Sequence, residues 1–340
     1  MTLQVLTVSG SHYECGRQIG LACPELIRRM IANTRTIIAP GLCWDDYRRA
    51  AQPYQFAAQR AFPWALDEIR GVADGAGVDF LDLFILSVEE LFSTSPASLC
   101  SDFAACSPAT EGHVLLAHNN DLSPAAQEYI LAIEWNFPDH PRLFTIGVGP
   151  FLSIGVNAQR IALTGNELFL NDTRPGVPRQ IIARAILSAG NFEEALAIAI
   201  HPDRASSYNN IISSRDGRIV SVEASATDYE FLYPEEGWLV HTNHYTHPRM
   251  KKYELDPREI PGSISRYERA RTLMQTRTGP VTLPMLKTFL SDHEAAPVSL
   301  CWHDPAGKVK TVFSALIDLT ELTVEAAVGN PCQGEFARIL

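Results

Sequence analysis

The chain has 340 residues, which is enough for one large domain or for a domain with an attached lobe. Its hydrophobic content of 46% and charged content of 20% are typical of a globular protein with a packed core. The formal net charge of −11 argues against a nucleic acid or an anionic membrane as the main partner.

The N-terminal segment lacks the basic and apolar regions of a secretory signal, and no window approaches the roughly 18 apolar residues that span a bilayer. The seven cysteines are an odd number without CxxC spacing, which argues against a disulfide framework and against a zinc site. We therefore expect a reducing, cytoplasmic location and no membrane partner.

Residues 1–95 are predicted to be mostly helical. Apolar residues recur there at three- and four-residue spacing in four segments that proline or glycine residues separate. The predicted helices are 23–38, 44–60, 62–76 and 79–92. A small polar loop, 93–98, then leads into Cys100.

After Cys100 the pattern changes to short strands with turns between them. The predicted strands are 100–106, 113–119, 129–136, 142–148, 152–156, 160–164, 210–214, 218–223, 229–233, 238–241, 310–318 and 323–328. The predicted helices are 178–189, 191–200, 265–276 and 283–292. Helices first, strands next and further helices inserted between strands predict an α+β layered fold.

The most informative segment is a predicted β-hairpin that turns at residues 108–112. Proline, threonine and glycine supply the turn, and the apolar run 114–117 suits a buried strand. Folding the chain at this turn lays Cys100 opposite about residue 120, within cross-strand contact distance. A thiol, Asn119 and Asp121 would then be neighbours, which is a candidate catalytic arrangement.

Each of these residues also has a purely structural interpretation. Most free cysteines are small buried apolar residues, and Cys100 fits that description as well. Asp121 could cap the turn that follows it. Cys106 lies next to the hairpin turn, too far from the other end to share a site, and is expected to be structural.

A second polar segment, 241–247, contains three histidines at three-residue spacing. A zinc site is not predicted there, because alternate residues leaving a strand point to opposite faces and no acidic ligand is near. Asn243 is of more interest, since an amide at a strand end is a good donor to an oxyanion. Asn166 is similarly placed after a strand and a glycine.

Several catalytic motifs are absent from the sequence. It contains no G-x-S-x-G, G-x-x-x-x-G-K-[ST], H-E-x-x-H or G-x-G-x-x-G. This excludes serine α/β-hydrolases, P-loop enzymes and Rossmann dehydrogenases.

Motifs along nearly the whole chain resemble one known family. They are His-Tyr-Glu-Cys-Gly-Arg-Gln-Ile-Gly at 12–20, Cys-Ser-x-Phe-Ala at 100–104, Gly-His-Val-Leu-Leu-Ala-His-Asn-x-Asp at 112–121, Gly-Val-Asn at 155–157, His-Thr-Asn-His-Tyr at 241–245, Ser-Leu-Cys-Trp-His at 299–303 and Gly-Asn-Pro-Cys at 329–332. In this order they resemble the acyl-coenzyme A:6-aminopenicillanic acid acyltransferase family, whose members are self-processing N-terminal nucleophile cysteine hydrolases.

The resemblance implies a four-layer αββα sandwich that is made as a precursor. Cleavage between Leu99 and Cys100 would give a helical α chain, 1–99, packed on a catalytic β chain, 100–340, as one integrated domain. An α-amine titrates near ~8, so the freed amine can serve as the base for its own thiol. The thiolate would attack an amide and form an acyl-enzyme.

The resemblance also assigns roles to single residues. It implies that Asp121 orients the nucleophile and that Asn243 donates to the oxyanion, with Asn166 as a further donor carried from the wider superfamily. Asn119, His244 and Trp302 are expected in the substrate pocket. No metal and no cofactor are expected.

Two positions depart from the family pattern. Trp302 stands where family members usually have an arginine, which predicts the loss of a fixed cation near the site. Leu99 is bulkier than the glycine often found before the nucleophile. An uncleaved chain would keep the Cys100 nitrogen in an amide and would lack its base.

The predicted function is therefore a self-processing cysteine amidohydrolase that cleaves a linear amide in a small molecule. One alternative is an acyl-CoA-dependent N-acyltransferase that uses the same site. An alternative of another class is an uncleaved, catalytically silent binding protein. The α and β fragments are expected to stay associated, and a homo-oligomer is left open.

Overall fold

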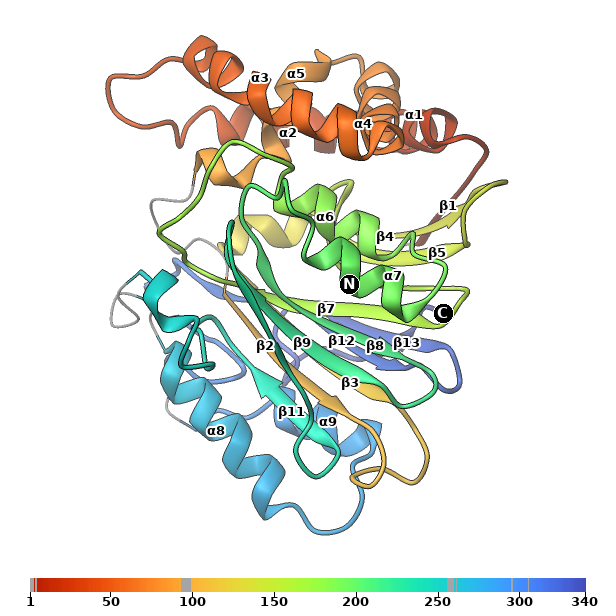
Figure 1. Ribbon diagram of the computed structural model, residues 1–340, viewed down its shortest axis with the longest axis vertical. Helices are drawn as coiled ribbons and strands as arrows, with labels where there is room; N and C mark the ends of the chain where they lie inside the picture. The colour runs from red at the N-terminus through yellow and green to blue at the C-terminus, as the bar shows by residue number, and fades with distance from the viewer. Residues whose placement is uncertain are drawn as a thin grey trace.

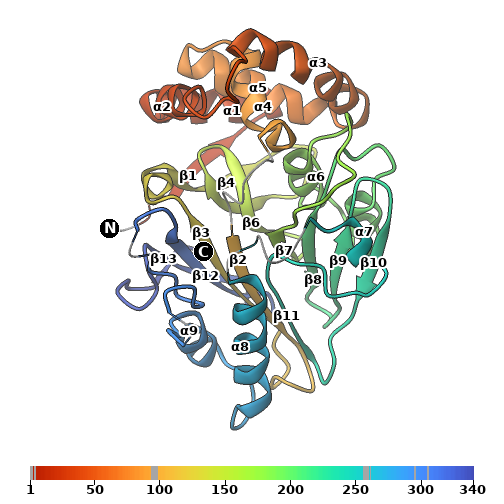
Figure 2. The same ribbon diagram turned by 90° about the vertical axis from the view of Figure 1, so that its left-hand side faces the viewer.

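The computed structural model describes Leu3 and residues 5–92, 99–255, 260, 262–294, 296–304 and 306–340. Two β-sheets pack face to face, and helices cover both outer faces (Figures 1 and 2). This is the predicted αββα sandwich. The predicted polar loop 93–98 lies outside the described residues.

Among the described residues, the larger sheet has eight strands in the order β1-β4-β5-β6-β7-β8-β9-β10. Their bounds are β1 (Val5–Ser9), β4 (Ile130–Asn136), β5 (Leu143–Val148), β6 (Phe151–Asn157), β7 (Ile161–Glu167), β8 (Tyr208–Ser214), β9 (Ile219–Ala224) and β10 (Tyr229–Leu232). Neighbours are antiparallel except β1, which runs parallel to β4. The segment 1–99 therefore contributes a strand as well as helices, and β1 was not predicted.

The smaller sheet, over the same described ranges, has six strands in the order β11-β2-β3-β12-β13-β14. Their bounds are β11 (Trp238–His241), β2 (Leu99–Ala105), β3 (Leu115–Leu122), β12 (Lys310–Asp318), β13 (Thr323–Val328) and β14 (Ala337–Arg338). The predicted hairpin is β2-β3, a pair of inner strands of this sheet, and the strands predicted over 310–318 and 323–328 pair with each other as β12-β13.

Most of the helices lie against the larger sheet. They are α1 (His12–Ala22), α2 (Pro24–Thr34), α3 (Trp44–Ala61), α4 (Pro63–Ala76), α5 (Phe80–Leu86), the 3₁₀ turn η1 (Glu89–Leu91), α6 (Arg179–Ile186) and α7 (Phe192–Ala199). The smaller sheet is covered by α8 (Ser263–Thr276) and α9 (Leu283–Leu290). The helix predicted over 79–92 stops at Leu86, and α1 was recognised only as a motif.

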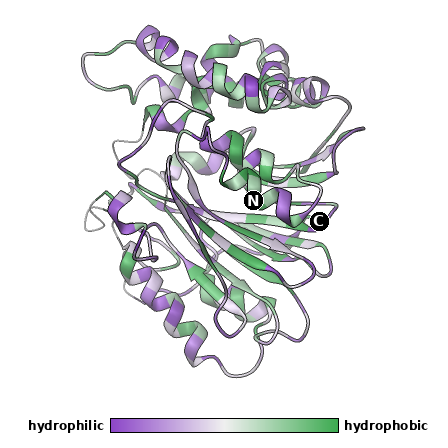
Figure 3. Ribbon diagram, viewed as in Figure 1, coloured by the Kyte–Doolittle hydropathy of each residue, from purple (hydrophilic) through white to green (hydrophobic). Residues whose placement is uncertain are grey.

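Side chains of β2 and β3 alternate between the two faces of the smaller sheet, as strand geometry requires. Ala104 and Leu116 face the larger sheet and belong to the core between the sheets. Phe103 and Ala117 face the opposite way and pack with residues of α8 and α9. Figure 3 shows the hydrophobic residues along these strands and the hydrophilic residues of α8. The polar residues near Cys100 are therefore exceptions to an otherwise apolar core.

Helices α1 and α4 cross at close range because glycines lie on both sides of the contact. A Cβ atom at Gly16 would lie 2.1 Å from the Glu68 carbonyl oxygen, and one at Gly71 would lie 2.1 Å from that of Tyr13. Gly20 and Gly75 have similar contacts, so the two backbones touch directly. Part of the N-terminal motif 12–20 is thus a packing requirement.

Within the part of the chain that the structure describes, every helix is too short or too polar to cross a membrane.

The α1–α4 contact gives a stability prediction. We expect Gly71→Ala to lower the free energy of unfolding by about 1–3 kcal/mol, because the added methyl group overpacks the contact. Gly190→Ala is the control, since its Cβ would meet only the Glu194 carboxylate at 3.4 Å, and its effect should stay within about 0.5 kcal/mol. Urea unfolding measures both. A Gly71→Ala variant as stable as the wild type would contradict the close packing.

Candidate active site

Cys100 lies in β2 directly opposite Asn120 of β3, which confirms the register predicted for the hairpin. Leu99 is opposite Asp121, and Ser101 is opposite Asn119. The Cys100 side chain is 3% exposed. The nucleophile candidate is therefore buried near the start of an inner strand of the smaller sheet.

The alternation of side chains divides the site into two halves. Asp102, His118 and Asn120 share the face of the Cys100 thiol, which is directed between the sheets. Asp121 lies on the opposite face, toward α8. The predicted proximity of Cys100 and Asp121 thus involves the backbone of Cys100 rather than its thiol.

The half around the thiol contains a buried ion pair. His118 Nδ1 lies 3.1 Å from Asp102 Oδ1, and both side chains are at most 1% exposed. Burial alone would lower the pKa of His118, but the charge of Asp102 and hydrogen bonds to Asp102 and Cys100 raise it to about 10. This shift favours the charged imidazolium form of His118 beside Cys100.

The pKa of the Cys100 thiol is shifted by opposing effects. On balance the pKa of Cys100 is raised, because burial and the charges of Asp102 and Asp121 outweigh the hydrogen bond and positive charge of His118, which lower it. Asn120 Nδ2 donates to Cys100 Sγ at 3.7 Å and lies 3.3 Å from His118 Nε2. The thiolate form thus has a cation and an amide donor next to it.

The second half of the site holds the backbone of Cys100. The Cys100 N–H donates to Asn243 Oδ1 at 3.1 Å. Arg266 of α8 donates from Nη1 to the Cys100 carbonyl oxygen at 2.6 Å and to Ser101 Oγ at 2.8 Å. Its Nη2 donates to Asn243 Oδ1 at 2.8 Å. Both peptide groups flanking Cα of Cys100 therefore have fixed partners.

Asp121 completes this half. Its Oδ1 accepts from Thr311 Oγ1 at 2.6 Å, and its Oδ2 lies 3.9 Å from Arg266 Nη1. Burial raises the pKa of Asp121 to about 6, against the opposing charge of Arg266 and the Thr311 hydrogen bond. Among the described residues, Asp121 Oδ2 has no hydrogen-bond partner, so it can accept from a new donor.

The expected loss of a cation at Trp302 needs a correction. The Arg266 guanidinium lies 5.3 Å from the Trp302 ring centroid, in a cation–π arrangement. Arg266 comes from another element of the chain, and it supplies the buried cation that Trp302 does not. The site therefore keeps a fixed positive charge.

A cavity of about 350 Å³ opens at the thiol. Cys100 and Asn120 form one part of its wall, and helices of the segment 1–99 form another. Its lining residues are Met30, Thr34, Ile37, Leu86, Glu89, Phe92, Cys100, Asn120, Leu122, Val148, Phe151, Leu152, Ser153, Leu163, Thr164, Gly165, Glu167, Arg179, Gln180, Ala183, Tyr208 and Asn210. This volume suits a small molecule.

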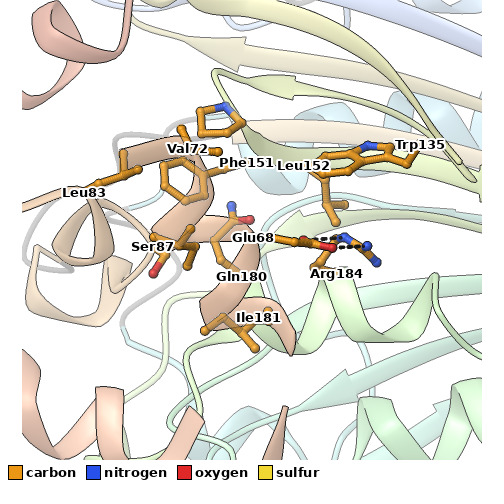
Figure 4. A pocket seen from close by; sticks show the side chains of 13 residues that line it. Glu68, Val72, Leu83, Ser87, Trp135, Phe151, Leu152, Gln180, Ile181 and Arg184 are labelled. Carbon is orange, nitrogen blue, oxygen red and sulfur yellow. Dashed lines mark hydrogen bonds and ion pairs between the residues drawn. The ribbon is translucent and has the colours of Figure 1, made fainter. Parts of the chain in front are cut away.

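A second, smaller hollow lies between α4, α6 and the strands β4 and β6 (Figure 4). Its volume of about 40 Å³ is far below that of an organic substrate. The buried ion pair between Arg184 and Glu68, with Nη2 and Oε1 2.6 Å apart, lies in its wall. We interpret this hollow as a packing feature.

The two asparagines that were predicted to donate to the oxyanion form hydrogen bonds with other groups in this structure. Asn243 uses Oδ1 for the Cys100 N–H, and its Nδ2 donates to the Glu167 carbonyl oxygen at 3.0 Å. Asn166 Nδ2 donates to Asp102 Oδ2 at 2.7 Å. Asn120 is the amide that reaches both the thiol and the cavity, so the donor roles of Asn243 and Asn166 remain predictions.

The residues expected in the substrate pocket do not belong to the described lining of the thiol cavity. Asn119 Nδ2 donates to the carbonyl oxygens of Leu290 and Leu300, on the α9 side of the sheet. His244 bonds Ser263 through Nδ1 at 2.8 Å. Trp302 packs in a small apolar cluster. All three side chains therefore lie on the side of the smaller sheet that is opposite the thiol cavity.

Sequence reasoning missed four residues of the site. Asp102, His118 and Asn120 could have been found by counting alternate positions from Cys100 along the predicted hairpin. Arg266 carried no comparable signal, because it lies in a helix 166 positions after Cys100 and reaches the site only through tertiary packing.

Residues 109–333 match the sequence model of the family described as acyl-coenzyme A:6-aminopenicillanic acid acyl-transferase. The chain belongs to this family. As a member it is an enzyme of the N-terminal nucleophile class that acts on amide bonds.

One relative that is similar in sequence is beta-alanyl-dopamine/carcinine hydrolase of Drosophila melanogaster. It is 22% identical over 383 aligned residues, which cover 97% of this chain and 94% of that protein. Among solved structures, a mutant of conjugated bile acid hydrolase from Clostridium perfringens has a TM-score of 0.48 at 11% identity, covering 71% of this chain and 96% of that one.

A second solved structure is the Caenorhabditis elegans ortholog of N-acylethanolamine-hydrolyzing acid amidase. It has a TM-score of 0.48 at 13% identity and covers 65% of this chain and 93% of that one.

The buried pair of His118 and Asp102 gives a pH prediction. Because the folded pKa of His118 lies above its ordinary value, the pair stabilises fully below about pH 6.5 and loses its effect as pH rises through about 10. His118→Gln should therefore lower the free energy of unfolding by about 3 kcal/mol or more at pH 6. The difference from the parent should shrink toward pH 10, as urea unfolding can measure.

Both proteins in that comparison should carry Cys100→Ala, so that the chain stays in one state; because Cys100 helps to raise the pKa of His118, the loss of the effect should then begin at a lower pH than in the wild type. His113→Gln is the matched control, since His113 is 41% exposed beside Asp318 and a surface pair is worth less than about 1 kcal/mol. An effect of His118→Gln that is the same at every pH would contradict the charged state assigned to His118.

Proposed function

We propose that this enzyme is a self-processing cysteine amidohydrolase, with Cys100 as both the residue that cleaves the precursor and the nucleophile that the cleavage exposes. The observation that carries the proposal is the placement of Cys100. Its thiol faces a substrate-sized cavity, while its nitrogen and carbonyl oxygen are held by Asn243 and Arg266 on the other side of the strand.

In the cleavage step, Cys100 Sγ attacks the carbonyl carbon of Leu99, and the Leu99–Cys100 C–N bond breaks to give a thioester and an amine. Water then hydrolyses the thioester, which releases the Leu99 carboxylate and regenerates the thiol. The Leu99 side chain is buried with Phe169, Ile260 and Trp302. An apolar cluster thus accommodates the bulk of Leu99, which supports cleavage despite its departure from the family pattern.

In the hydrolytic cycle, the freed amine of Cys100 accepts the thiol proton and donates it to the leaving amine of the substrate. Asn243 Oδ1, which accepts from the Cys100 N–H in the uncleaved chain, would accept a hydrogen bond from this amine, and Asp121 Oδ2, which has no hydrogen-bond partner among the described residues, would be a second acceptor. The His118 imidazolium favours the thiolate. Asn120, beside the thiol, is the nearest amide donor for the oxyanion.

The segment 1–99 should remain bound after cleavage. Strand β1 pairs with β4 over residues 5–9, and α1–α5 belong to the same apolar core as α6 and α7. Residues of α2 and α5 also line the cavity beside Cys100. The α fragment would thus shape substrate choice while the β fragment supplies the chemistry.

The cavity wall carries an excess of acidic groups. Arg179 pairs with both Glu89 and Glu167, and its backbone N–H donates to Glu90 Oε1 at 2.9 Å. Burial raises the pKa of Glu167 to about 7, opposed by Arg179 and aided by the charge of Glu89. Burial likewise raises the pKa of Glu90.

Two carboxyl groups of the cavity wall, Glu89 and Glu167, share the single guanidinium of Arg179, and this excess of acidic groups would favour a ligand with a positive charge. We therefore propose an aminoacyl amide, whose ammonium group would lie against this wall, as the substrate class. The name of the Drosophila relative, a hydrolase of beta-alanyl-dopamine and carcinine, agrees with this choice. An acyl-CoA donor is disfavoured, because its phosphates would meet the same carboxylates.

Self-processing is tested on a denaturing gel. The wild-type chain should separate into fragments 1–99 and 100–340, whereas Cys100→Ala should stay intact and lose amidase activity. Cys106→Ala, in the same strand region but near the turn, is the control and should be cleaved normally. An intact wild-type chain that still hydrolyses amides would rule out this mechanism, and an intact chain without activity would favour the silent binding protein.

The substrate class is tested with two amides of one amine, beta-alanyl-dopamine and N-acetyldopamine. Glu167→Gln should lower kcat/KM about tenfold for the aminoacyl amide and leave the acetyl amide nearly unchanged, since a tenfold effect corresponds to about 1.4 kcal/mol of lost attraction. In the wild type, KM for the aminoacyl amide should rise as pH falls below about 7, because Glu167 becomes protonated.

Glu193→Gln is the control for a general charge effect, because Glu193 pairs with Arg218 on the exposed surface. Equal losses for both amides would show that Glu167 acts on the fold of the site rather than on the substrate charge. Faster turnover with an acyl-CoA and a free amine than with either amide would favour the acyltransferase alternative.

A further inference from the structure

Four potential metal ligands gather at one point away from Cys100. They are His293, Cys301, His303 and Cys332, and one donor atom from each lies within 4.8 Å of the others. The first three belong to the connection between α9 and β12, and Cys332 follows β13. Side chains from two separate segments thus meet in one cluster.

The distances are close to those of a tetrahedral site. His303 Nε2 lies 3.3 Å from Cys301 Sγ and 3.3 Å from Cys332 Sγ. The rings of His293 and His303 have centroids 5.2 Å apart. With Zn–S near 2.3 Å and Zn–N near 2.0–2.1 Å, tetrahedral donors lie about 3.3–3.8 Å apart, so a contraction of about 1 Å at the longest separation would close the site around an ion.

The chemistry of the donors selects the metal. Two thiols and two imidazoles form a set that prefers zinc and other borderline or soft ions, and it contains no oxygen ligand of the kind that calcium or magnesium requires. Asn330 Nδ2 donates to Cys301 Sγ at 3.7 Å, as outer-shell donors do at metal thiolates.

The burial of the cluster also suits an ion that enters from solvent. Cys301 is buried, His303 is partly buried, and His293 and Cys332 are exposed. An ion can therefore reach the two exposed ligands first. Four protein ligands leave no open position, which is typical of a structural rather than a catalytic site.

We propose that His293, Cys301, His303 and Cys332 bind one zinc ion in a structural site. The proposal stands apart from the function proposed for Cys100. CxxC spacing is absent from this cluster, which is why no zinc site was expected from the sequence. The sequence contains only the short pattern Cys301-x-His303 as a local indication of metal binding. The fold brings the other two ligands, His293 and Cys332, to this pattern.

The place of the site explains what an ion would stabilise. Trp302 lies between two of the ligands, and its backbone is held by Thr311 and Asn330. A zinc ion would tie the α9–β12 connection to the C-terminal tail on both sides of this residue. The tail after β13 would then be anchored by more than the two-residue strand β14.

The test is metal analysis of the full chain, made without a metal-affinity tag and without chelators. The chain should contain about one zinc per molecule by mass spectrometry of the metal. After zinc is exchanged for Co²⁺, visible ligand-field bands and a thiolate-to-metal charge-transfer band should appear. Cys332→Ser and His293→Ala should each weaken zinc binding by more than the roughly 10–100-fold that loss of an outer-shell partner costs.

These two variants change exposed ligands, so both should fold; Cys301→Ser, at the buried position, is expected to abolish binding. Cys43→Ser, another exposed cysteine, and His113→Gln are controls that should keep the metal. A chelator should lower Tm of the Cys43→Ser control and leave that of Cys332→Ser unchanged. A chain that takes up no stoichiometric zinc or cobalt, or one in which mapping finds a Cys301–Cys332 disulfide, would overturn the proposal.

Discussion

The buried guanidinium of Arg266 is the interaction on which the arrangement of the site depends. Its side chain is fully enclosed, and burial lowers its pKa, so its charge has to be compensated inside the protein. The compensation comes from the Cys100 carbonyl oxygen, Asn243 Oδ1 and the charge of Asp121, while the Trp302 ring lies against the guanidinium. These partners come from β2, β3 and the segments after β11 and α9. One cation therefore fixes the position of α8 on the smaller sheet and, through it, the backbone of the nucleophile.

Because side chains alternate along a strand, the two faces of the smaller sheet act on different parts of Cys100. The thiol face contains Asn120 and the His118–Asp102 pair, which act on the charge of sulfur. The opposite face contains Arg266 and Asp121, which act on the Cys100 backbone. The nitrogen of a terminal nucleophile is a backbone atom until cleavage and a catalytic base afterwards. Contacts on one face of the strand fix the Cys100 backbone while its side chain points to the other face. These contacts can keep the nitrogen in position when it is converted from a peptide nitrogen to a terminal amine.

The parts of the molecule that the sequence predicted are those set by local patterns. The hairpin register followed from one turn, and α7 lies within the helix predicted over 191–200, where the Asn191 side chain accepts from Glu194 N–H. The residues that share a face with Cys100 were within reach of the same counting. Long-range packing left no such pattern: β1 pairs with β4, far along the chain, and Arg266 and the cluster around His303 depend on how separate segments meet. Trp302 was interpreted as the loss of a cation because the compensating residue lies in another element.

The two faces also bear on how one cysteine can act on its own chain and then on a second amide. The Leu99 side chain lies on the Arg266 face, in the cluster with Phe169 and Trp302, whereas the cavity opens on the thiol face. If Cys100 cleaves the chain, the new Leu99 carboxylate forms on a residue whose side chain this cluster already holds. The substrate then approaches from the side that Leu99 never occupied. The end of the α fragment need not leave the protein before turnover begins, and a fragment that stays in place keeps α2 and α5 in the cavity wall.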